Sequence, residues 1–350
     1  MIKYLGSKRT LVPVLGDLAV GAGARTALDL FTGTTRVAQE LKRRGIHVTA
    51  ADVASYSTVL SDCYVATDAD AVSEDLDVEL ARLDALPGAP GYFTETFCER
   101  SRFFQAKNGA RVDAVRDAIE RDHPPGSPLR PVLLTSLMLA ADRVDSTTGV
   151  QMAYLKEWAP RAHRDLRLTR PELIRGAGAT LAGDVMDTVA RAPHVDLAYV
   201  DPPYNQHRYF ANYHIWETLV RWDAPEHYGV ACKRVDTRET RSVFNSRRTM
   251  PDALRRVLSA VRADVLVVSY NDESWVTAEE ITDMLRAAGH ETVRLLSFDR
   301  KRYVGAQIGI YNPAGDKVGE VARLRNVEYV FVAGPAERVD AAVSSVAAAR

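Results

Sequence analysis

The segment between residues 26 and 52 places the strongest constraint on the fold. Its first part, TALDLF (26–31), is a short apolar run that ends in a turn, which is typical of a buried parallel strand. GTTRVAQELKRRG (33–45) has apolar residues at helical spacing, and IHVTAAD (46–52) predicts a second strand. Strand, turn, helix and strand form a βαβ unit, whose strands are parallel. The unit therefore predicts an α/β fold: a Rossmann-like, doubly wound, mostly parallel sheet.

A helical block interrupts this pattern. Between residues 54 and 175, three segments have the apolar period of a helix: EDLDVELARLDAL, ARVDAVRDAIERD and VLLTSLMLAADRVD. Strand-like runs resume at 195–200, 264–270, 290–298 and 326–334. We therefore predict three parts: a sheet domain of residues 1–60 and 176–335, an inserted helical domain over 61–175, and a tail over 336–350 that is either a terminal helix or disordered.

Composition argues against several classes of protein. The sequence has no apolar run long enough to span a bilayer, and its N-terminal apolar stretch stops at Asp17, which argues against a secretory signal. Cys63, Cys98 and Cys232 are far apart and odd in number, which indicates neither a zinc site nor a disulfide framework. We expect a cytoplasmic protein with no membrane partner and no metal.

Charge is distributed unevenly along the chain. The formal net charge is −1, whereas a nucleic-acid-binding protein usually has a basic surplus. Residues 205–262, however, contain eleven Lys and Arg against six Asp and Glu. A nearly neutral total can therefore hide a basic face, although a solvated helix surface is the alternative interpretation of such a run.

The tetrapeptide Asp201-Pro202-Pro203-Tyr204 follows the apolar run VDLAYV, where an α/β sheet places its ligands. An amine on an aromatic base is a poor nucleophile, because its lone pair is delocalised into the ring. The Asp201 carboxylate and the Pro202 carbonyl can accept its two N–H groups, and Tyr204 offers a flat face for an extruded base. The motif therefore indicates methylation of such an amine, with an ordinary surface turn as the alternative.

DPPY, together with TALDLFTGTTRVA (26–38) and KYLGSKRTL (3–11), resembles the DNA adenine methylase family, in the class whose cofactor motifs precede the catalytic motif. The match spans about residues 3–60 and 180–335. It implies a site-specific methyltransferase that moves the methyl group of S-adenosylmethionine to adenine N6 in double-stranded DNA. Such a protein is an orphan methylase or part of a restriction-modification system with a cognate endonuclease, and we expect a monomer or a weak dimer.

The resemblance also implies a set of cofactor-binding residues. The turn after the first strand would hold the methionine part and the ribose of the cofactor through Asp29, Phe31, Gly33 and Thr34. Asp52 would accept hydrogen bonds from the ribose hydroxyls, as the acidic residue of a dinucleotide site does. Tyr4 and Lys8 would close the site, with Lys8 facing the cofactor carboxylate, and Asp184 would lie beside the adenine amine.

One residue departs from the family pattern in this turn. Thr35 stands where members often have a second glycine, so the path of the backbone is open to question. Turn residues are the alternative interpretation of Asp52 and Asp184. A nicotinamide cofactor is disfavoured, because GTTRVA contains only one glycine of the G-x-G-x-x-G pattern.

Basic and aromatic residues after DPPY are candidates for contacts with DNA. We expect Lys233, Arg234, Arg247 and Arg248 to contact phosphates, with Arg238 and Arg241 as further candidates, and Asn205 to lie at the target. Tyr209, Tyr213 and Trp216 offer rings, although Tyr213 and Trp216 are equally typical of a core. SYNDE (269–273) resembles a family segment at the target pocket, where Tyr270 would stack, and the helical insertion occupies the place of the family's target-recognition region.

Two other functions remain open at this stage. The same electronic argument applies to the N4 amine of cytosine and to RNA, although Asp201 favours adenine by resemblance. A nucleic-acid-binding homologue without catalytic activity is the third possibility, but Asp52, Asp201 and Tyr204 are all present.

Overall fold

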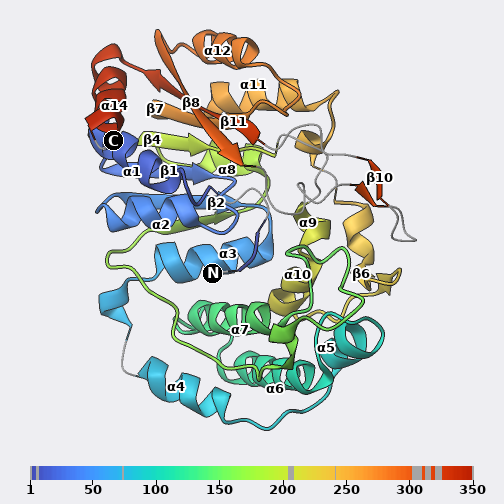
Figure 1. Cartoon of the computed structure of the whole chain (residues 1–350). Helices are drawn as coiled ribbons and strands as arrows, with labels where there is room; N and C mark the ends of the chain where they lie inside the picture. The colour runs from blue at the N-terminus through green and yellow to red at the C-terminus, as the bar shows by residue number, and fades with distance from the viewer. Residues whose placement is uncertain are drawn as a thin grey trace.

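The computed structural model describes residues 2–4, 8–72, 75–203, 209–240, 242–301, 310–311, 317–319 and 325–348. Its centre is a seven-stranded sheet with the order β3-β2-β1-β4-β7-β11-β8. The strands are β1 (Thr26–Leu30), β2 (His47–Asp52), β3 (Ala179–Ala182), β4 (Val195–Val200), β7 (Ala263–Asn271), β8 (Thr292–Lys301) and β11 (Arg325–Gly334). The prediction of a Rossmann-like, doubly wound, mostly parallel sheet is confirmed (Figure 1).

The direction of the strands determines where a ligand can bind. β1 pairs in parallel with both β2 and β4, while β11 runs antiparallel between β7 and β8. The chain thus crosses from one side of β1 to the other, which opens a crevice beyond the carboxyl ends of β1 and β4. Leu30 is in register with Val200, so the residues that follow them, Phe31 and Asp201, leave the sheet side by side.

Helices cover both faces of the sheet. α1 (Val12–Gly21), α2 (Arg36–Arg43) and α14 (Ala336–Ala348) pack into an apolar core with one face. α8 (Val185–Arg191), α11 (Met250–Ala260) and α12 (Ala278–Ala287) pack with the other. α12 starts with a capping box between Thr277 and Glu280. The side chain of each residue accepts the backbone N–H of the other, so these N–H groups at the start of the helix have acceptors. The tail that the sequence left as helical or disordered is helical over α14.

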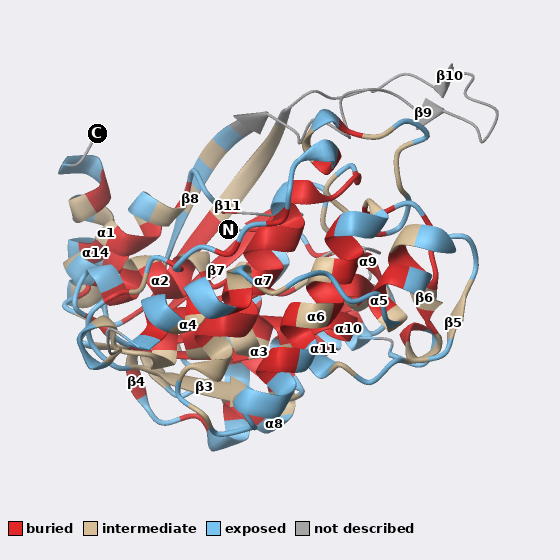
Figure 2. Cartoon of the chain, turned by 90° about the horizontal axis from the view of Figure 1, so that it is seen from below, coloured by how far each residue is buried: buried red, intermediate tan, exposed pale blue. Residues whose placement is uncertain are grey.

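A helical block lies beside the sheet, in the lower half of Figure 1. It contains α4 (Asp75–Asp84), α5 (Tyr92–Thr94), α6 (Ala106–Asp122) and α7 (Arg130–Val144), and α3 (Ser55–Ser61) connects it to β2 and β3. α10 (His214–Arg221) packs into the same core, although it follows β4 in the chain. Buried residues are concentrated in this block and along the sheet (Figure 2). The division into domains at residues 61 and 175 stays a prediction.

The remaining elements are short. They are α9 (Tyr209–Asn212), the π-helices η1 (Asp62–Ala66) and η3 (Glu95–Glu99), the 3-10 turns η2 (Ala69–Ala71), η4 (Pro160–His163), η5 (Val235–Arg238) and η6 (Val243–Asn245), and the strand pairs β5 (His227–Tyr228) with β6 (Lys233–Arg234) and β9 (Ile310–Tyr311) with β10 (Lys317–Gly319). In the part of the chain that the structure describes, no helix is both long and apolar enough to cross a membrane.

Candidate active site

A cavity of about 490 Å³ lies at the carboxyl ends of the central strands. Four neighbouring strands each bring one predicted site residue to its wall: Phe31 follows β1, Asp52 ends β2, Asp184 comes just after β3, and Asp201 follows β4. Because the carboxyl ends of parallel strands meet at one edge of a sheet, residues far apart in the sequence converge here. Pro202 and Tyr4 also line this cavity.

The turn after β1 holds an unusual backbone. Phe31, Gly33 and Thr35 have φ angles of +62°, +54° and +60°, in the left-handed region that disfavours residues with a side chain. Thr35 therefore keeps a glycine-like conformation at the position where family members often have glycine. Its hydroxyl donates to the Thr34 carbonyl and accepts from the Gln39 side chain at 2.8 Å, which helps to hold the strained residue in place.

Asp52 ties this turn to the end of β2. Its Oδ2 accepts the Gly33 N–H at 2.8 Å, and its Oδ1 accepts the Ala54 N–H at 3.0 Å. Burial raises the pKa of Asp52, while these backbone donors lower it. The carboxylate both shapes the turn and lies in the cavity wall, where it can accept further hydrogen bonds from a ligand.

Asp29 lies beneath the turn rather than in the cavity wall. Its Oδ2 accepts the Thr32 hydroxyl at 2.7 Å and the Ala38 N–H at 3.1 Å, and burial raises its pKa to about 7. Gly33 and Thr34 are also buried and, like Asp29, do not line the cavity. Of the four residues expected in this turn, only Phe31 faces the cavity, and the other three support its shape.

The aromatic ring of Tyr4 forms one wall of the cavity. It stacks on Tyr213 with centroids 4.6 Å apart and on Tyr209 at 5.5 Å. A Cβ atom on Gly33 would lie 3.2 Å from the Tyr4 ring, and Gly33 has a φ of +54°, so both the close approach and the backbone favour glycine here. Tyr213 and Trp216 are buried, as the core interpretation of these rings expected.

The Asp201 carboxylate is paired with Lys8 beside the cavity. The Lys8 ammonium lies 3.2 Å from Asp201 Oδ1 and 3.0 Å from Glu328 Oε2, and it is buried. Lys8 does not line the cavity, so the structure places its ammonium on the Asp201 carboxylate and not toward a cofactor carboxylate as expected. Burial raises the pKa of Asp201 to about 6, and the Lys8 charge acts to lower it.

The family model described as D12 class N6 adenine-specific DNA methyltransferase matches residues 4–284. The chain belongs to this family. The resemblance inferred from DPPY and the two N-terminal segments is thereby confirmed.

Relatives of the chain include type II methyltransferases. M.FokI of Planomicrobium okeanokoites is 26% identical over 326 residues, which cover 86% of this chain and 50% of that protein. M.CviAII of Paramecium bursaria Chlorella virus 1 is 28% identical over 267 residues, which cover 75% and 79%. The chain thus spans about half the length of M.FokI. An O-methyltransferase from Bacillus cereus aligns over 94% of this chain and 82% of its own at 10% identity, with a TM-score of 0.31.

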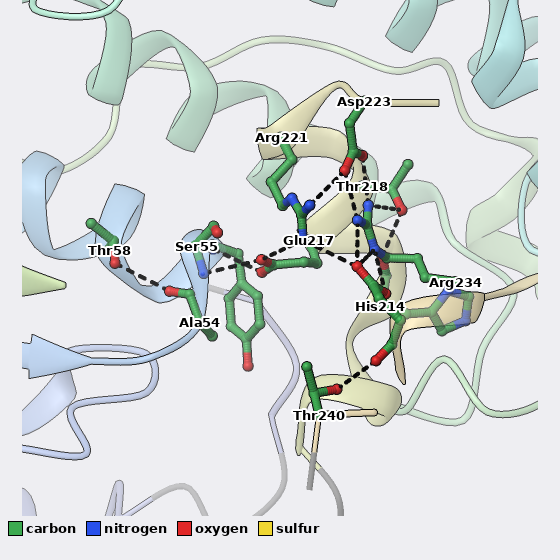
Figure 3. A network of polar contacts seen from close by, with 12 residues as sticks. Ala54, Ser55, Thr58, His214, Glu217, Thr218, Arg221, Asp223, Arg234 and Thr240 are labelled. Atoms are coloured by element: carbon green, nitrogen blue, oxygen red, sulfur yellow. Dashed lines mark hydrogen bonds and ion pairs between the residues drawn. The ribbon is translucent and has the colours of Figure 1, made fainter. Parts of the chain in front are cut away.

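Two residues predicted to contact DNA are buried in this family member. Arg234 is 1% exposed, and its guanidinium lies 2.6 Å from Asp223 Oδ1 and 2.8 Å from Asp236 Oδ2 (Figure 3). These carboxylates neutralise the charge that was expected to bind a phosphate, so that expectation was wrong. Tyr270 is also 1% exposed and packs in the core of the sheet, where it cannot stack on an extruded base.

The other predicted DNA contacts are placed differently. Arg247 and Arg248 are exposed just before α11, and Lys233 is half-buried on β6. Arg238 is exposed, with its guanidinium 3.9 Å from the centroid of the Tyr228 ring. Tyr204, Asn205 and Arg241 lie outside the described residues.

Glu217 on α10 is a site residue that the sequence interpretation missed. It is 2% exposed, lines the cavity, and accepts the Ser55 and Tyr56 N–H groups at 3.3 and 3.4 Å (Figure 3). α3 begins after Ala54, whose methyl side chain cannot accept a hydrogen bond from the start of the helix. The Glu217 carboxylate therefore accepts the first backbone N–H groups of α3. Burial raises the pKa of Glu217. The signal was an acidic residue within the apolar segment HIWETLV.

Proposed function

We propose that the protein transfers the methyl group of S-adenosylmethionine to the N6 amine of adenine in double-stranded DNA. The observation that carries the proposal is a shared cavity: Asp201 and Pro202, expected to hold the amine, line the same space as Tyr4, Asp52 and Asp184. Membership of the D12 class supports adenine as the base. A donor and an acceptor bound in one cavity can be held in a reactive orientation.

The cavity fits the proposed cofactor. Its volume of about 490 Å³ lies within the range of small-molecule sites. The rings of Tyr4, Phe31 and Phe244 line it, and Phe31 and Phe244 meet edge to face with centroids 5.1 Å apart. Asp52 and Asp184 add acceptors for hydroxyl and amine groups. When bound, S-adenosylmethionine supplies an electrophilic methyl group on a sulfonium.

Asp201 has two roles in the proposed reaction. As an ionised carboxylate it accepts one N–H of the adenine amine, which returns electron density to the nitrogen, and the Pro202 carbonyl accepts the other. Methylation leaves a cationic amine that must lose a proton. Asp201, whose pKa burial raises to about 6, is a suitable group to receive that proton.

The remaining parts of the proposal concern DNA and its setting. The exposed Arg247 and Arg248 are proposed phosphate contacts, and the half-buried Lys233 is a further one. Tyr204 is proposed to stack on the extruded adenine, and Asn205 to lie at the target. A cognate endonuclease, a monomer or weak dimer, and a cytoplasmic location stay predictions.

The proposal is tested by following the transferred label. The protein is incubated with tritiated S-adenosylmethionine and duplex DNA, and the DNA is digested to nucleosides. We expect the label in N6-methyldeoxyadenosine. Label in N4-methyldeoxycytidine, label only when RNA replaces DNA, or no label at all would each reject adenine methylation of DNA.

The pH dependence of methylation is expected to follow the charge of Asp201. Burial raises the pKa of Asp201 to about 6, so kcat/KM should fall as the pH drops through about 6 and the acceptor becomes protonated. The Lys8 charge lowers this pKa, so Lys8→Gln should move the acid limb to higher pH. Arg286→Gln, on the exposed face of α12, is the charge-matched control. If the acid limb of the pH profile of kcat/KM is the same in Lys8→Gln as in the parent, the charge of Lys8 does not act on Asp201.

Removal of the Glu217 carboxylate is expected to weaken cofactor binding. Glu217→Ala leaves the first N–H groups of α3 without acceptors, and the adjoining Asp52 turn then loses its support. We expect KM for S-adenosylmethionine to rise by roughly tenfold, since hydrogen bonds to charged groups contribute about 1.5–3 kcal/mol each. The change in kcat should be smaller, and Glu217→Gln, which keeps an acceptor, should recover most of the binding.

Thr240→Ala provides the control for Glu217. Thr240 also lines the cavity, but its hydroxyl donates only to the Asp236 carbonyl among the described residues. Steady-state kinetics with varied cofactor should show a much smaller change in KM for this variant than for Glu217→Ala. If Glu217→Ala has the same KM as Thr240→Ala, Glu217 does not position the cofactor site.

A further inference from the structure

A second cavity, of about 410 Å³, shares no lining residue with the active-site cavity. Five arginines line it against one carboxylate, Glu172: they are Arg9, Arg36, Arg43, Arg143 and Arg170. These arginines come from the segment before α1, from α2, from α7 and from the segment before β3. Separate parts of the chain thus converge on one strongly basic concave surface.

Most of this positive charge is not neutralised within the protein. Among the described residues, Arg9 and Arg36 have no carboxylate within ion-pair distance, and Arg36 Nε is buried without a hydrogen-bond partner. Arg143 donates to the Thr169 hydroxyl at 3.0 Å, which carries no charge. Arg43 lies 4.0 Å from Glu40, at the limit of an ion pair, and Arg170 pairs with Asp77 at 2.6 Å.

Four of the five arginines are exposed to solvent, and the cost of the arrangement is concentrated at the half-buried Arg36. Like charges gathered in a concave wall repel one another, and a buried guanidinium N–H without an acceptor loses its hydration without compensation. Arg9 and Arg36 line the same cavity, and burial and the charge of Arg9 both lower the pKa of Arg36. Arginine has a planar fork of donors that matches the oxygens of a phosphate group.

We propose that this cavity is a binding site for a phosphate group, with Arg9 and Arg36 as its main ligands and Arg43 and Arg143 in support. The phosphate can belong to the backbone of bound DNA or to a free anion, and the chemistry that recognises it is the same. The site lies outside the methyl-transfer cavity, so the free-anion form of the proposal does not rest on the proposed function, whereas the DNA form rests on the DNA binding that function includes.

The test uses the full chain and two probes. Inorganic pyrophosphate is titrated into the protein by calorimetry, and duplex DNA binding is measured by fluorescence anisotropy over a series of salt concentrations. Both are repeated with Arg36→Gln. The control is Arg286→Gln, which removes the same charge from an exposed position on α12. Thermal unfolding of each variant shows that it is folded.

The two probes distinguish the source of the phosphate. At least tenfold weaker pyrophosphate binding in Arg36→Gln, with unchanged DNA binding, identifies a site for a free anion. A fall of about one in the slope of log K against log salt identifies a contact with the DNA backbone. If Arg36→Gln matches both the parent and Arg286→Gln in both assays, the proposal is overturned. Neither assay measures methylation, so failure here is separate from failure of the proposed function.

Discussion

Asp201→Ala is expected to lower kcat for DNA methylation by roughly 10²–10³-fold, the usual effect of removing one preorganised polar group from a reaction centre. The variant loses both the acceptor that activates the adenine amine and the group proposed to receive its proton. Asp201→Asn keeps an oxygen acceptor but neither the charge nor the basicity of the carboxylate. Its rate should therefore lie between the rates of the parent and of Asp201→Ala. The measurement is tritium transfer to duplex DNA at saturating concentrations of both substrates.

Binding measurements separate this chemical effect from damage to the fold. Lys8 keeps Glu328 as a partner at 3.0 Å when Asp201 is removed, so the surrounding structure should persist. Affinity for S-adenosylmethionine, measured by calorimetry, should therefore change little in Asp201→Ala. A variant that methylates DNA as fast as the parent would show that the Asp201 carboxylate has no part in the reaction.

Asp52→Ala should give the second large effect, on binding and not on the chemical step. The variant loses the acceptor for Gly33 and Ala54 as well as the acceptor proposed for the cofactor ribose. Hydrogen bonds to a charged group contribute about 1.5–3 kcal/mol, and about 1.4 kcal/mol corresponds to a tenfold change in affinity. We therefore expect roughly 10- to 100-fold weaker binding of S-adenosylmethionine.

Two comparisons make the Asp52 result specific. Asp52→Asn keeps one oxygen acceptor and should bind more tightly than Asp52→Ala. Thermal unfolding reports whether the turn between β1 and α2 still forms. If calorimetry gives the parent affinity for Asp52→Ala, the cofactor does not bind at the end of β2.

The sequence predicted the sheet and the main site residues for a physical reason. Period and turn signals located β1, β2 and β4, and the parallel βαβ topology then required their carboxyl ends to meet. Asp201 could be placed in a site on this ground, whereas the cofactor roles of Phe31 and Asp52 came from the family resemblance. β3 was missed because ATLA is a short, half-buried strand at the sheet edge with no distinct alternation. α1 was also missed, although Pro13 lies in its first turn, where proline is a typical helix-start residue.

The errors in the site arose from side-chain pairing and burial that the sequence pattern does not show. The Lys8 ammonium donates a hydrogen bond to Glu328, which lies 320 residues later in the chain, and no local sequence pattern can indicate such a contact. Arg234 was counted as part of a basic stretch, but the fold brings Asp223 and Asp236 onto its guanidinium. Tyr270 stood at the end of an apparent strand, but β7 continues to Asn271 and keeps the ring in the core. Counting local charge and rings cannot detect such pairing.

The most direct test of the account is the structure of the protein with S-adenosylhomocysteine and a duplex that contains its target adenine. We predict that the extruded N6 amine lies within about 3 Å of an Asp201 carboxylate oxygen and of the Pro202 carbonyl, with the cofactor product beside Asp52. An amine that contacts other groups, while Asp201 stays bound only to Lys8, would contradict the account.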